Sequence, residues 1–376
     1  MGLFTRRRSE DRALTRATLP ASMLPSDPGE PGVAPQAALR IAEVYSCVRA
    51  LVDAAAALPL HAYRRTDAGH VRHDGQLAQL LTHPAPWMTT SALVGSIMAS
   101  LQLHGDAFLG LYRDGAGGIA QLGLLEPSAV EVRVEEGELV YLLMTKDGVA
   151  RLTERDICHV RAPLPDASGL RGLSPIRACA QTLGLARGLA RHANQFTNQG
   201  GRPGLLITLD PKVKATDPTM LAALRADVQG RESGSVIVLG GGVDQVTPLA
   251  LNLVDMEFVA QRVHSAQEVA RIFRVPASML DLPAGDSLTY ATVAEQARSF
   301  VRWSLGPWLR VIEEALSGHS ELSLGNQFVR FNLDAVLAAA PVERAQFYES
   351  AIRAGWMTIA EVRRVEDLPN LPVENT

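Results

Sequence analysis

Two long helical patterns separated by a compact insert constrain this chain more than any other feature of its sequence. The first begins at Ser174-Pro175, where serine suits the N-cap and proline suits the first helical position, since the N–H that proline lacks has no helical partner there. Its apolar residues recur three and four positions apart until Gly200-Gly201 ends the pattern. The second pattern begins at Asp255, the predicted cap, and reaches Phe273 in a narrow apolar seam. We therefore expect two long helices that flank the insert.

The insert over residues 202–252 is predicted to be a small unit of mixed secondary structure. It has a strand from Gly204 to Leu209, a helix from Asp217 to Gln229 and a strand from Ser235 to Leu239. The run Gly240–Gly242 then invites comparison with a phosphate-binding loop. Neither GxGxxG nor a GxxxxGKS/T pattern is present, and the residues that follow cannot open a helix toward a phosphate. A hairpin turn is the favoured interpretation.

The part of the chain before these helices is predicted to be an α+β module. Helices are expected from Ala38 to Ala57 and from Thr90 to Leu103, the second entered through Thr89, Thr90 or Ser91. Short strands separated by turn-forming residues accompany these helices. The predicted strands are His61–Arg64, Ala107–Arg113, Ile119–Leu125, Val130–Val134, Leu139–Met144 and Ile157–Val160.

A third long helix is predicted from about Leu288 to Ser317. Gly306-Pro307 should kink it, because proline removes a backbone hydrogen bond. A strand from Phe328 to Asn332 and two short helices follow, and the last helix starts at Thr358, which has Glu361 at the capping-box spacing.

Composition places the chain among ordinary globular proteins. It has 376 residues, of which 47% are apolar and 20% charged, and the length suggests two or three domains. The net charge of -4 argues against a protein that grips nucleic acid through a broad basic surface. Cys47, Cys158 and Cys179 form no CxxC pattern, so neither a disulfide framework nor a structural zinc site is supported.

Neither a targeting segment nor a membrane span stands out. The N-terminus lacks the apolar core of a signal peptide, and no apolar run approaches the roughly twenty residues that cross a bilayer. Residues 1–38 carry five prolines without an apolar period and are expected to be a disordered N-terminal arm. We expect a soluble protein without a membrane partner.

Catalytic constellations are equally absent from the sequence. The nine histidines form no HExxH motif, and the cluster His70, His73 and Asp74 is better interpreted as solvated surface than as a metal site. Cys158 and His159 are adjacent on a predicted strand and should point to opposite faces, so they cannot form a nucleophile–base pair. A chain with three long helices and no such site is typical of an assembly component.

Eight short segments follow one another along the chain in a characteristic order. They are Val44-Tyr45-Ser46-Cys47-Val48-Arg49, Gly105-Asp106-Ala107-Phe108, Asp156–Arg161, Gly169–Ile176, Val269–Pro276, Pro307-Trp308-Leu309, Phe331–Asp334, and Ala354–Thr358 with Glu361-Val362-Arg363. Together they resemble the portal proteins of tailed bacteriophages, in the family of phages with long non-contractile tails and of gene transfer agents. Their order and spacing over about residues 38 to 370 carry the resemblance.

The resemblance implies a portal fold with named parts. It assigns 39–173 to an α+β wing, 174–201 and 253–275 to stem helices, 202–252 to the clip, 276–289 to a tunnel loop, 290–339 to a wing helix and strand, and 340–376 to a short crown. One departure is His83-Pro84-Ala85-Pro86-Trp87, where the family often has Asn-Pro-Asn-Pro before the tryptophan. The prolines preserve the turn.

The resemblance also implies a function without catalysis or a cofactor. About twelve subunits would form a ring at one capsid vertex, through which double-stranded DNA is packaged and ejected. Its partners would be the large terminase, the major capsid protein and the head–tail adaptor or connector, and it would assemble in the host cytoplasm and reside in the virion. Twelve stem helices spaced about 10 Å apart would leave a bore of roughly 28 Å, which is wide enough for a DNA duplex.

Two groups of residues are implied to face the DNA. The tunnel-loop residues are Asp281, Leu282, Pro283, Ala284, Gly285, Asp286 and Ser287, for which a plain surface loop is the alternative. The stem-channel residues are Asp255, Glu257, Arg262, Glu268 and Arg271. This set is slightly acidic, as suits a bore for sliding, because every neutralised phosphate is a point of adhesion.

Two other functions stay open from the residues alone. One is a hydrolase or nucleotide-binding enzyme that uses the Gly240–Gly242 turn or the histidine-rich loop. The other is a membrane-surface scaffold that uses the arginines Arg6–Arg8.

Overall fold

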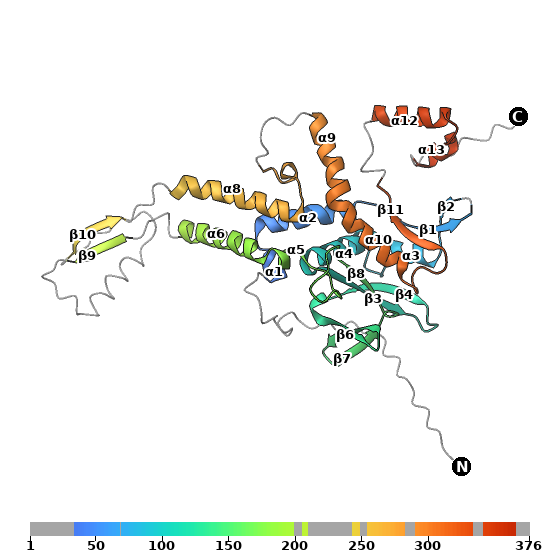
Figure 1. Ribbon diagram of the computed structural model, residues 1–376, viewed down its shortest axis with the longest axis horizontal. Coiled ribbons are helices and arrows are strands. Elements are labelled where there is room, and N and C mark those ends of the chain that lie inside the picture. Colours follow the sequence, from blue (N-terminus) through green and yellow to red (C-terminus); the bar gives the residue numbers. More distant parts are fainter. Residues whose placement is uncertain are drawn as a thin grey trace, which may run out of the picture.

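The computed structural model describes residues 34–67, 69–198, 205–209, 243–248, 254–282, 290–333 and 341–365. It shows an α+β body from which two long helices project side by side, α6 (Ala180–Asn198) and α8 (Val254–Phe273) (Figure 1). Beyond their far ends lies an antiparallel strand pair, β9 (Leu205–Leu209) and β10 (Val243–Pro248). The predicted fold class and the pair of long helices are confirmed.

The described part of the body contains antiparallel sheets with the strand orders β4-β3-β8, β5-β6-β7 and β11-β1-β2. The strands are β1 (Leu60–Thr66), β2 (Gly69–Arg72), β3 (Asp106–Arg113), β4 (Ile119–Leu125), β5 (Val130–Glu135), β6 (Glu138–Thr145), β7 (Gly148–Thr153), β8 (Ile157–Arg161) and β11 (Gln327–Phe331). The other helices are α1 (Pro35–Ala38), α2 (Ala42–Ala56), α3 (Gln76–Thr82), α4 (Thr90–His104), α5 (Pro175–Ala178), α9 (Tyr290–Ser299), α10 (Gly306–Gly318), α12 (Pro341–Arg353) and α13 (Ile359–Val365). Among the described helices, none is long and apolar enough to cross a bilayer.

Helices α2 and α4 form the centre of the main core, because each presents a row of apolar side chains to the other. The buried residues are Val44, Cys47, Val48, Leu51 and Ala55 of α2, and Leu93, Val94, Ile97, Met98 and Leu101 of α4. Of the three cap candidates, Thr89 is the cap of α4, and its hydroxyl accepts a hydrogen bond from Ala92 N at 3.3 Å. Gly105 ends the helix in the left-handed conformation at φ 83°.

The third long helix is interrupted where proline was predicted to disturb it. Between α9 and α10 the residues Phe300–Leu305 form a π-helical segment. The Gly306 N–H bonds to Val301 O, five residues back, immediately before Pro307 enters α10 without an N–H to donate. The wider π-helical turn therefore accommodates the proline, and the helical path continues from α9 into α10 (Figure 1).

Several predicted boundaries are wrong. Ala38 is buried within α1, so the arm predicted over residues 1–38 includes residues that pack on α4. The helix predicted to run unbroken from Ser174 is interrupted at Cys179, because α5 packs on α4 whereas α6 packs on α8. Val254 already lies in α8, so Asp255 is not its cap.

The sequence predictions also miss β2, α3, β7 and β10. Strand β2 is exposed along its whole length and β7 buries only Leu152, so neither shows the alternation that predicts a strand. Strand β9 confirms the prediction at Gly204–Leu209. The predictions for 217–229, 235–239 and Gly240–Gly242 lie outside the described residues.

A buried carboxylate joins the body to the first long helix. One oxygen of Asp106 accepts hydrogen bonds from Gly172 N at 2.7 Å and from His159 Nε2 at 3.0 Å. The other oxygen accepts from Arg171 Nε at 2.7 Å, while that guanidinium also donates to the carbonyls of Pro127 and Val130. The Asp106 side chain is fully buried, whereas the Arg171 side chain is 26% exposed.

Two glycines allow this junction to close. A Cβ on Gly105 would lie 2.3 Å from Gly172 O, and a Cβ on Gly172 would lie 2.1 Å from Gly105 O, so neither position has room for a side chain. Two residues later Ser174 caps α5 by accepting from Ile176 N at 3.0 Å and Arg177 N at 3.2 Å. The junction therefore fixes the point at which the chain leaves the body toward α6.

Charge and burial act in opposite directions at the junction. Burial alone would raise the pKa of Asp106, but the hydrogen bonds from His159, Gly172 and Arg171 outweigh it and lower the pKa below its ordinary value. Burial lowers the pKa of His159, and the bond to Asp106 opposes that effect only in part. The junction thus holds an ionised carboxylate, a neutral imidazole and a guanidinium.

Replacing the carboxylate should destabilise the protein strongly. We expect Asp106→Asn to lower the free energy of unfolding by about 3 kcal/mol, because it leaves the Arg171 guanidinium without its counter-ion in a mostly buried place. Denaturant unfolding followed by circular dichroism measures the change.

The matched control is Asp53→Asn, which breaks the exposed pair between Arg49 Nε and Asp53 Oδ2 at 3.1 Å. This variant should unfold nearly as the unmodified chain does, because an exposed pair contributes little. Equal effects of the two substitutions would show that the junction does not support the fold.

Acidification should weaken the same junction. Because the folded-state pKa of His159 lies below its ordinary 6.5, the unfolded chain binds more protons there, and stability falls as the pH drops from about 7 toward that folded value. His159 contributes at most about 1.4 kcal/mol per pH unit. Burial lowers the pKa of His104 in the same direction, so the comparison is with His159→Gln, whose stability should fall less between pH 7 and 5. Identical pH profiles of stability for the two proteins would contradict the assignment of this effect to His159.

Candidate functional site

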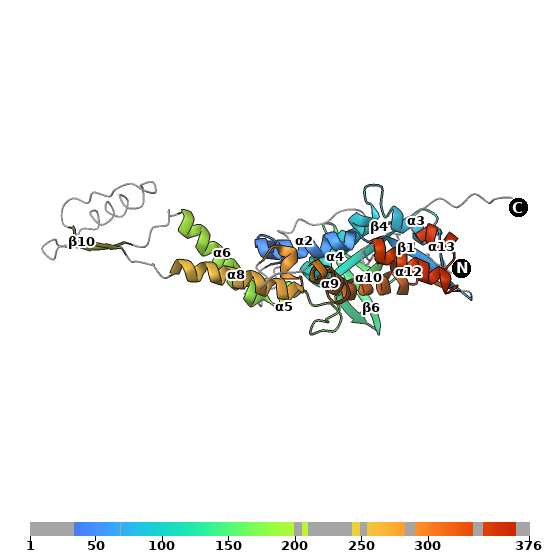
Figure 2. The same ribbon diagram turned by 90° about the horizontal axis from the view of Figure 1, so that it is seen from above.

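The pair α6 and α8 is the first candidate for a functional surface, because the two helices leave the body together. They run side by side in Figure 1 and cross at an angle near the body in the perpendicular view (Figure 2). At the end nearer the body they bury apolar side chains, namely Leu183 and Ala186 of α6 and Ala266, Val269, Ala270 and Phe273 of α8. Alanine at three of these positions favours close helix packing, and we call the pair the rod.

The sequence-predicted stem residues have different surroundings on α8. Arg262 Nη2 lies 3.8 Å from Glu43 Oε1 of α2, so a body helix partly neutralises this arginine. Glu268 Oε1 lies 3.6 Å from His264 Nε2, one turn earlier on the same helix. Arg271 is exposed in the last turn of α8. Asp255 and Glu257 belong to α8, but their side chains lie outside the described residues.

The predicted tunnel segment starts with a tightly held turn. Arg274 and Asp281 both adopt left-handed backbone conformations, at φ 56° and φ 51°, on either side of the 3-10 helix Ala277–Leu280. Ser304 Oγ donates to Arg274 O at 2.6 Å, and Ser278 Oγ donates to Gln296 Oε1 at 2.7 Å, so both ends of the turn are tied to the helix that follows.

Only two of the seven predicted tunnel-loop residues are described. Asp281 is exposed, whereas Leu282 packs against the main core. Pro283, Ala284, Gly285, Asp286 and Ser287 lie outside the described residues. The structure therefore brings the beginning of the segment to the base of α8 and leaves its remaining residues a prediction.

The two buried cysteines are poor nucleophiles, and the described residues hold no cluster of metal-ligating side chains. Burial raises the pKa of Cys47 and of Cys158 to about 12, so both thiols stay protonated at neutral pH. Cys158 faces the main core while the His159 ring stacks on Phe108 on the other side of β8, as the strand alternation predicts. Within the described residues, no group of three or more metal-ligating side chains is close enough together to hold an ion.

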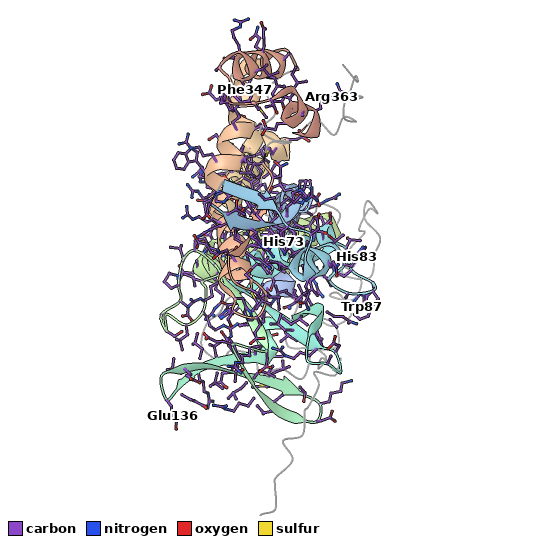
Figure 3. All side chains as sticks on the ribbon, turned by 90° about the vertical axis from the view of Figure 1, so that its right-hand side faces the viewer. His73, His83, Trp87, Glu136, Phe347 and Arg363 are labelled. Atoms are coloured by element: carbon purple, nitrogen blue, oxygen red, sulfur yellow. The ribbon has the colours of Figure 1, made fainter. Side chains whose placement is uncertain are left out.

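Exposed aromatic residues form a second kind of candidate that the sequence patterns did not reveal. Trp87 lies beside His83 at the edge of a shallow depression of about 560 Å³ between the Pro84–Met88 turn and β4 (Figure 3). Phe347 of α12 contacts Trp356, with ring centroids 5.5 Å apart, and both rings are more than half exposed. Spacing alone could not identify them, because exposure depends on which elements pack together.

Comparison with known proteins identifies the family. The family model described as "Phage portal protein" matches residues 42–367. The chain is 26% identical to the probable portal protein of Streptomyces phage phiC31 over 366 residues, covering 90% of this chain and 77% of the relative. It is 23% identical to the portal protein of Enterobacteria phage HK97 over 353 residues, covering 92% and 82%.

The fold leads to the same group. A chain in the neck of a native gene transfer agent particle, computed with C12 symmetry, superposes with a TM-score of 0.58 at 23% identity and covers 90% of this chain and 94% of that one. The match of the family model over most of the chain and the shared fold agree, and this chain belongs to the phage portal protein family.

Proposed function

We propose that this chain assembles into a closed ring of about twelve subunits at one capsid vertex and that double-stranded DNA enters and leaves the capsid through its centre. The observation that carries the proposal is the rod of α6 and α8, which projects from the body with the β9–β10 pair at its far end (Figures 1 and 2). In a chain of this family, such rods side by side around an axis would form the wall of a channel. The twelvefold symmetry of the related neck structure supports the subunit number.

The parts of the channel follow from this arrangement. Helices α6 and α8 would be the stem, the segment 202–252 the clip, the body the wing and α12 with α13 the crown. Each subunit would contact two neighbours through different faces of its stem and wing, in a head-to-tail interface that closes into a ring. The exposed side of α6 carries Leu185, which is 59% exposed and would meet the next subunit.

The stem would carry charges of both signs. Glu268 and Asp281 are acidic and Glu43 partly neutralises Arg262, whereas Arg271 of α8 and Arg187 and Arg191 of α6 are exposed cations. Asp255, Glu257 and Arg271 would complete the stem wall, and Asp281–Ser287 the tunnel loop. Acidic groups among these cations would favour sliding, because they weaken lasting contacts with phosphates.

The partners would be those of a DNA conduit. The clip would dock the large terminase during packaging and the head–tail adaptor or connector afterwards, and the wing would contact the major capsid protein. Assembly would take place in the host cytoplasm and the finished ring would belong to the virion. The chain itself would hydrolyse nothing, since the terminase supplies the energy of packaging.

Ring assembly should be visible directly. We expect native mass spectrometry and negative-stain images of the purified protein to show a closed ring that is a multiple of the 40.4 kDa subunit. Leu185→Asp should lower the ring fraction at least about tenfold, because it would bury a charge between subunits.

Leu324→Asp is the matched control, since Leu324 is also 59% exposed but lies in the turn between α10 and β11. It should leave the rings intact. A stable monomer at high protein concentration, even beside capsid protein, would contradict the channel.

Reversing charge in the bore should slow DNA passage. We expect Glu268→Arg combined with Asp281→Arg to reduce the DNA packaged per head in a reconstituted packaging reaction, with partial recovery at higher salt because added arginines bind phosphates electrostatically. Glu314→Arg, on the exposed side of α10, is the control for added positive charge. Normal packaging by the double variant would contradict the assignment of these residues to the bore.

A further inference from the structure

The sheet β11-β1-β2 is unusually basic for a chain with a net charge of -4. Its three strands, LHAYRRT, GHVR and QFVRF, carry four arginines and two histidines and no aspartate or glutamate. The strand register divides the side chains of this sheet between two faces. Leu60, Ala62, Val329 and Phe331 are paired and buried on one face, which packs on the core.

The other face gathers cationic and aromatic side chains, and we call it the basic sheet face. The register places His61 opposite Arg330, Tyr63 opposite both Phe328 and Arg72, and Arg65 opposite His70. The basic sheet face therefore consists of His61, Tyr63, Arg65, His70, Arg72, Phe328 and Arg330. The three arginines and His70 are exposed, while the rings of Tyr63 and Phe328 are half-buried between them.

Aromatic contacts hold the cationic groups in place. The rings of Tyr63 and Phe328 stack with centroids 5.6 Å apart and an interplanar angle of 22°. The Arg65 guanidinium lies 5.4 Å from the Phe328 centroid, and the His70 ring meets Phe328 edge-on at 5.1 Å. These side chains are thereby partly ordered before any ligand arrives, so a ligand would lose less entropy in binding them.

The charge of this face is largely uncompensated. Within the described part of the chain, Arg65, Arg72 and Arg330 take part in no ion pair. Arg330 interacts electrostatically with Glu313 of α10, whose carboxylate accepts a hydrogen bond from Phe331 N at 2.7 Å. Asp67, in the turn between β1 and β2, and Asp74, shortly after β2, are the acidic residues close to the hairpin in sequence. The basic sheet face thus presents three arginines to solvent on one small surface.

We propose that the basic sheet face binds the phosphate backbone of double-stranded DNA outside the channel. The sheet lies at the opposite end of the molecule from β9 and β10, and Figure 3 views that end directly, with His73 beside β2 labelled. A site there is distinct from the stem and from the tunnel segment. DNA that contacts it would lie along the body and not within the bore.

The arrangement favours duplex backbone over single strands. Proteins that bind single strands offer free aromatic faces on which bases stack. Here the aromatic rings are occupied by one another, by Arg65 and by His70, and the groups left to meet a ligand are guanidinium ions. Guanidinium ions are well suited to phosphate oxygens and read no sequence in the backbone.

Relaxed closed-circular DNA tests the site apart from the channel, because it cannot thread a ring that is already closed. Full-length protein is purified first, and its binding to closed-circular duplex is measured by filter retention at several salt concentrations. The test variant is Arg65→Gln/Arg72→Gln/Arg330→Gln. The control is Arg49→Gln/Arg310→Gln/Arg353→Gln, which removes the same charge from three exposed arginines that each pair with an acidic residue on their own helix.

We expect the test variant to bind circular duplex at least about tenfold more weakly, with a salt slope smaller by about 2 to 3, since each phosphate contact contributes about 0.9. The control should bind as the unmodified protein does. Equal losses in the two variants, no binding by the unmodified protein, or preference for single-stranded circles would each overturn the proposal. Failure of ring formation would contradict the channel and leave this measurement unaffected.

Discussion

The point at which the chain leaves the body toward the first long helix depends on one buried carboxylate and the two glycines beside it. Asp106 binds the loop that leads to the first long helix, and Gly105 and Gly172 touch backbone to backbone because neither has a side chain. A shift at this contact would bring the Gly105 and Gly172 backbones into collision or expose the Asp106 carboxylate to solvent. Because the long helices extend far from this point, a small rotation at Asp106 would displace β9 and β10 by a large distance.

The two helices extend outward from the body as a packed pair (Figure 1). Ala186 of α6 and Ala266 and Ala270 of α8 are buried small residues, which suit close approach of a neighbouring helix. The π-helical segment serves a related purpose further along the chain. It admits Pro307 without breaking the helix, while Ser304 in that segment holds the end of α8 through Arg274 O. The end of α8 nearer the body is thereby fixed to it.

Local signals in the sequence predicted elements well and their junctions poorly. Ser174-Pro175 and Thr358 with Glu361 are recognisable because their hydrogen bonds are made within a few residues. The segments containing Gly105-Asp106, His159 and Gly169–Ile176 are recognisable only through their resemblance to a family. Their residues contact partners more than fifty positions away in the sequence, and such contacts leave no periodic pattern. The basic sheet face was missed for the same reason, since β11 joins β1 from more than 250 residues away.

The distribution of charge connects these observations. A protein through which a polyanion slides cannot be basic everywhere, and the net charge of -4 is consistent with a bore that binds weakly. Weak binding inside the bore does not require weak binding elsewhere. A cationic surface remote from the stem would hold DNA along the body without adding friction in the channel, because the two sets of contacts lie at opposite ends of the molecule. Separation of the two surfaces by the length of the molecule is what would allow one subunit to both hold and release the same polymer (Figures 1 and 2).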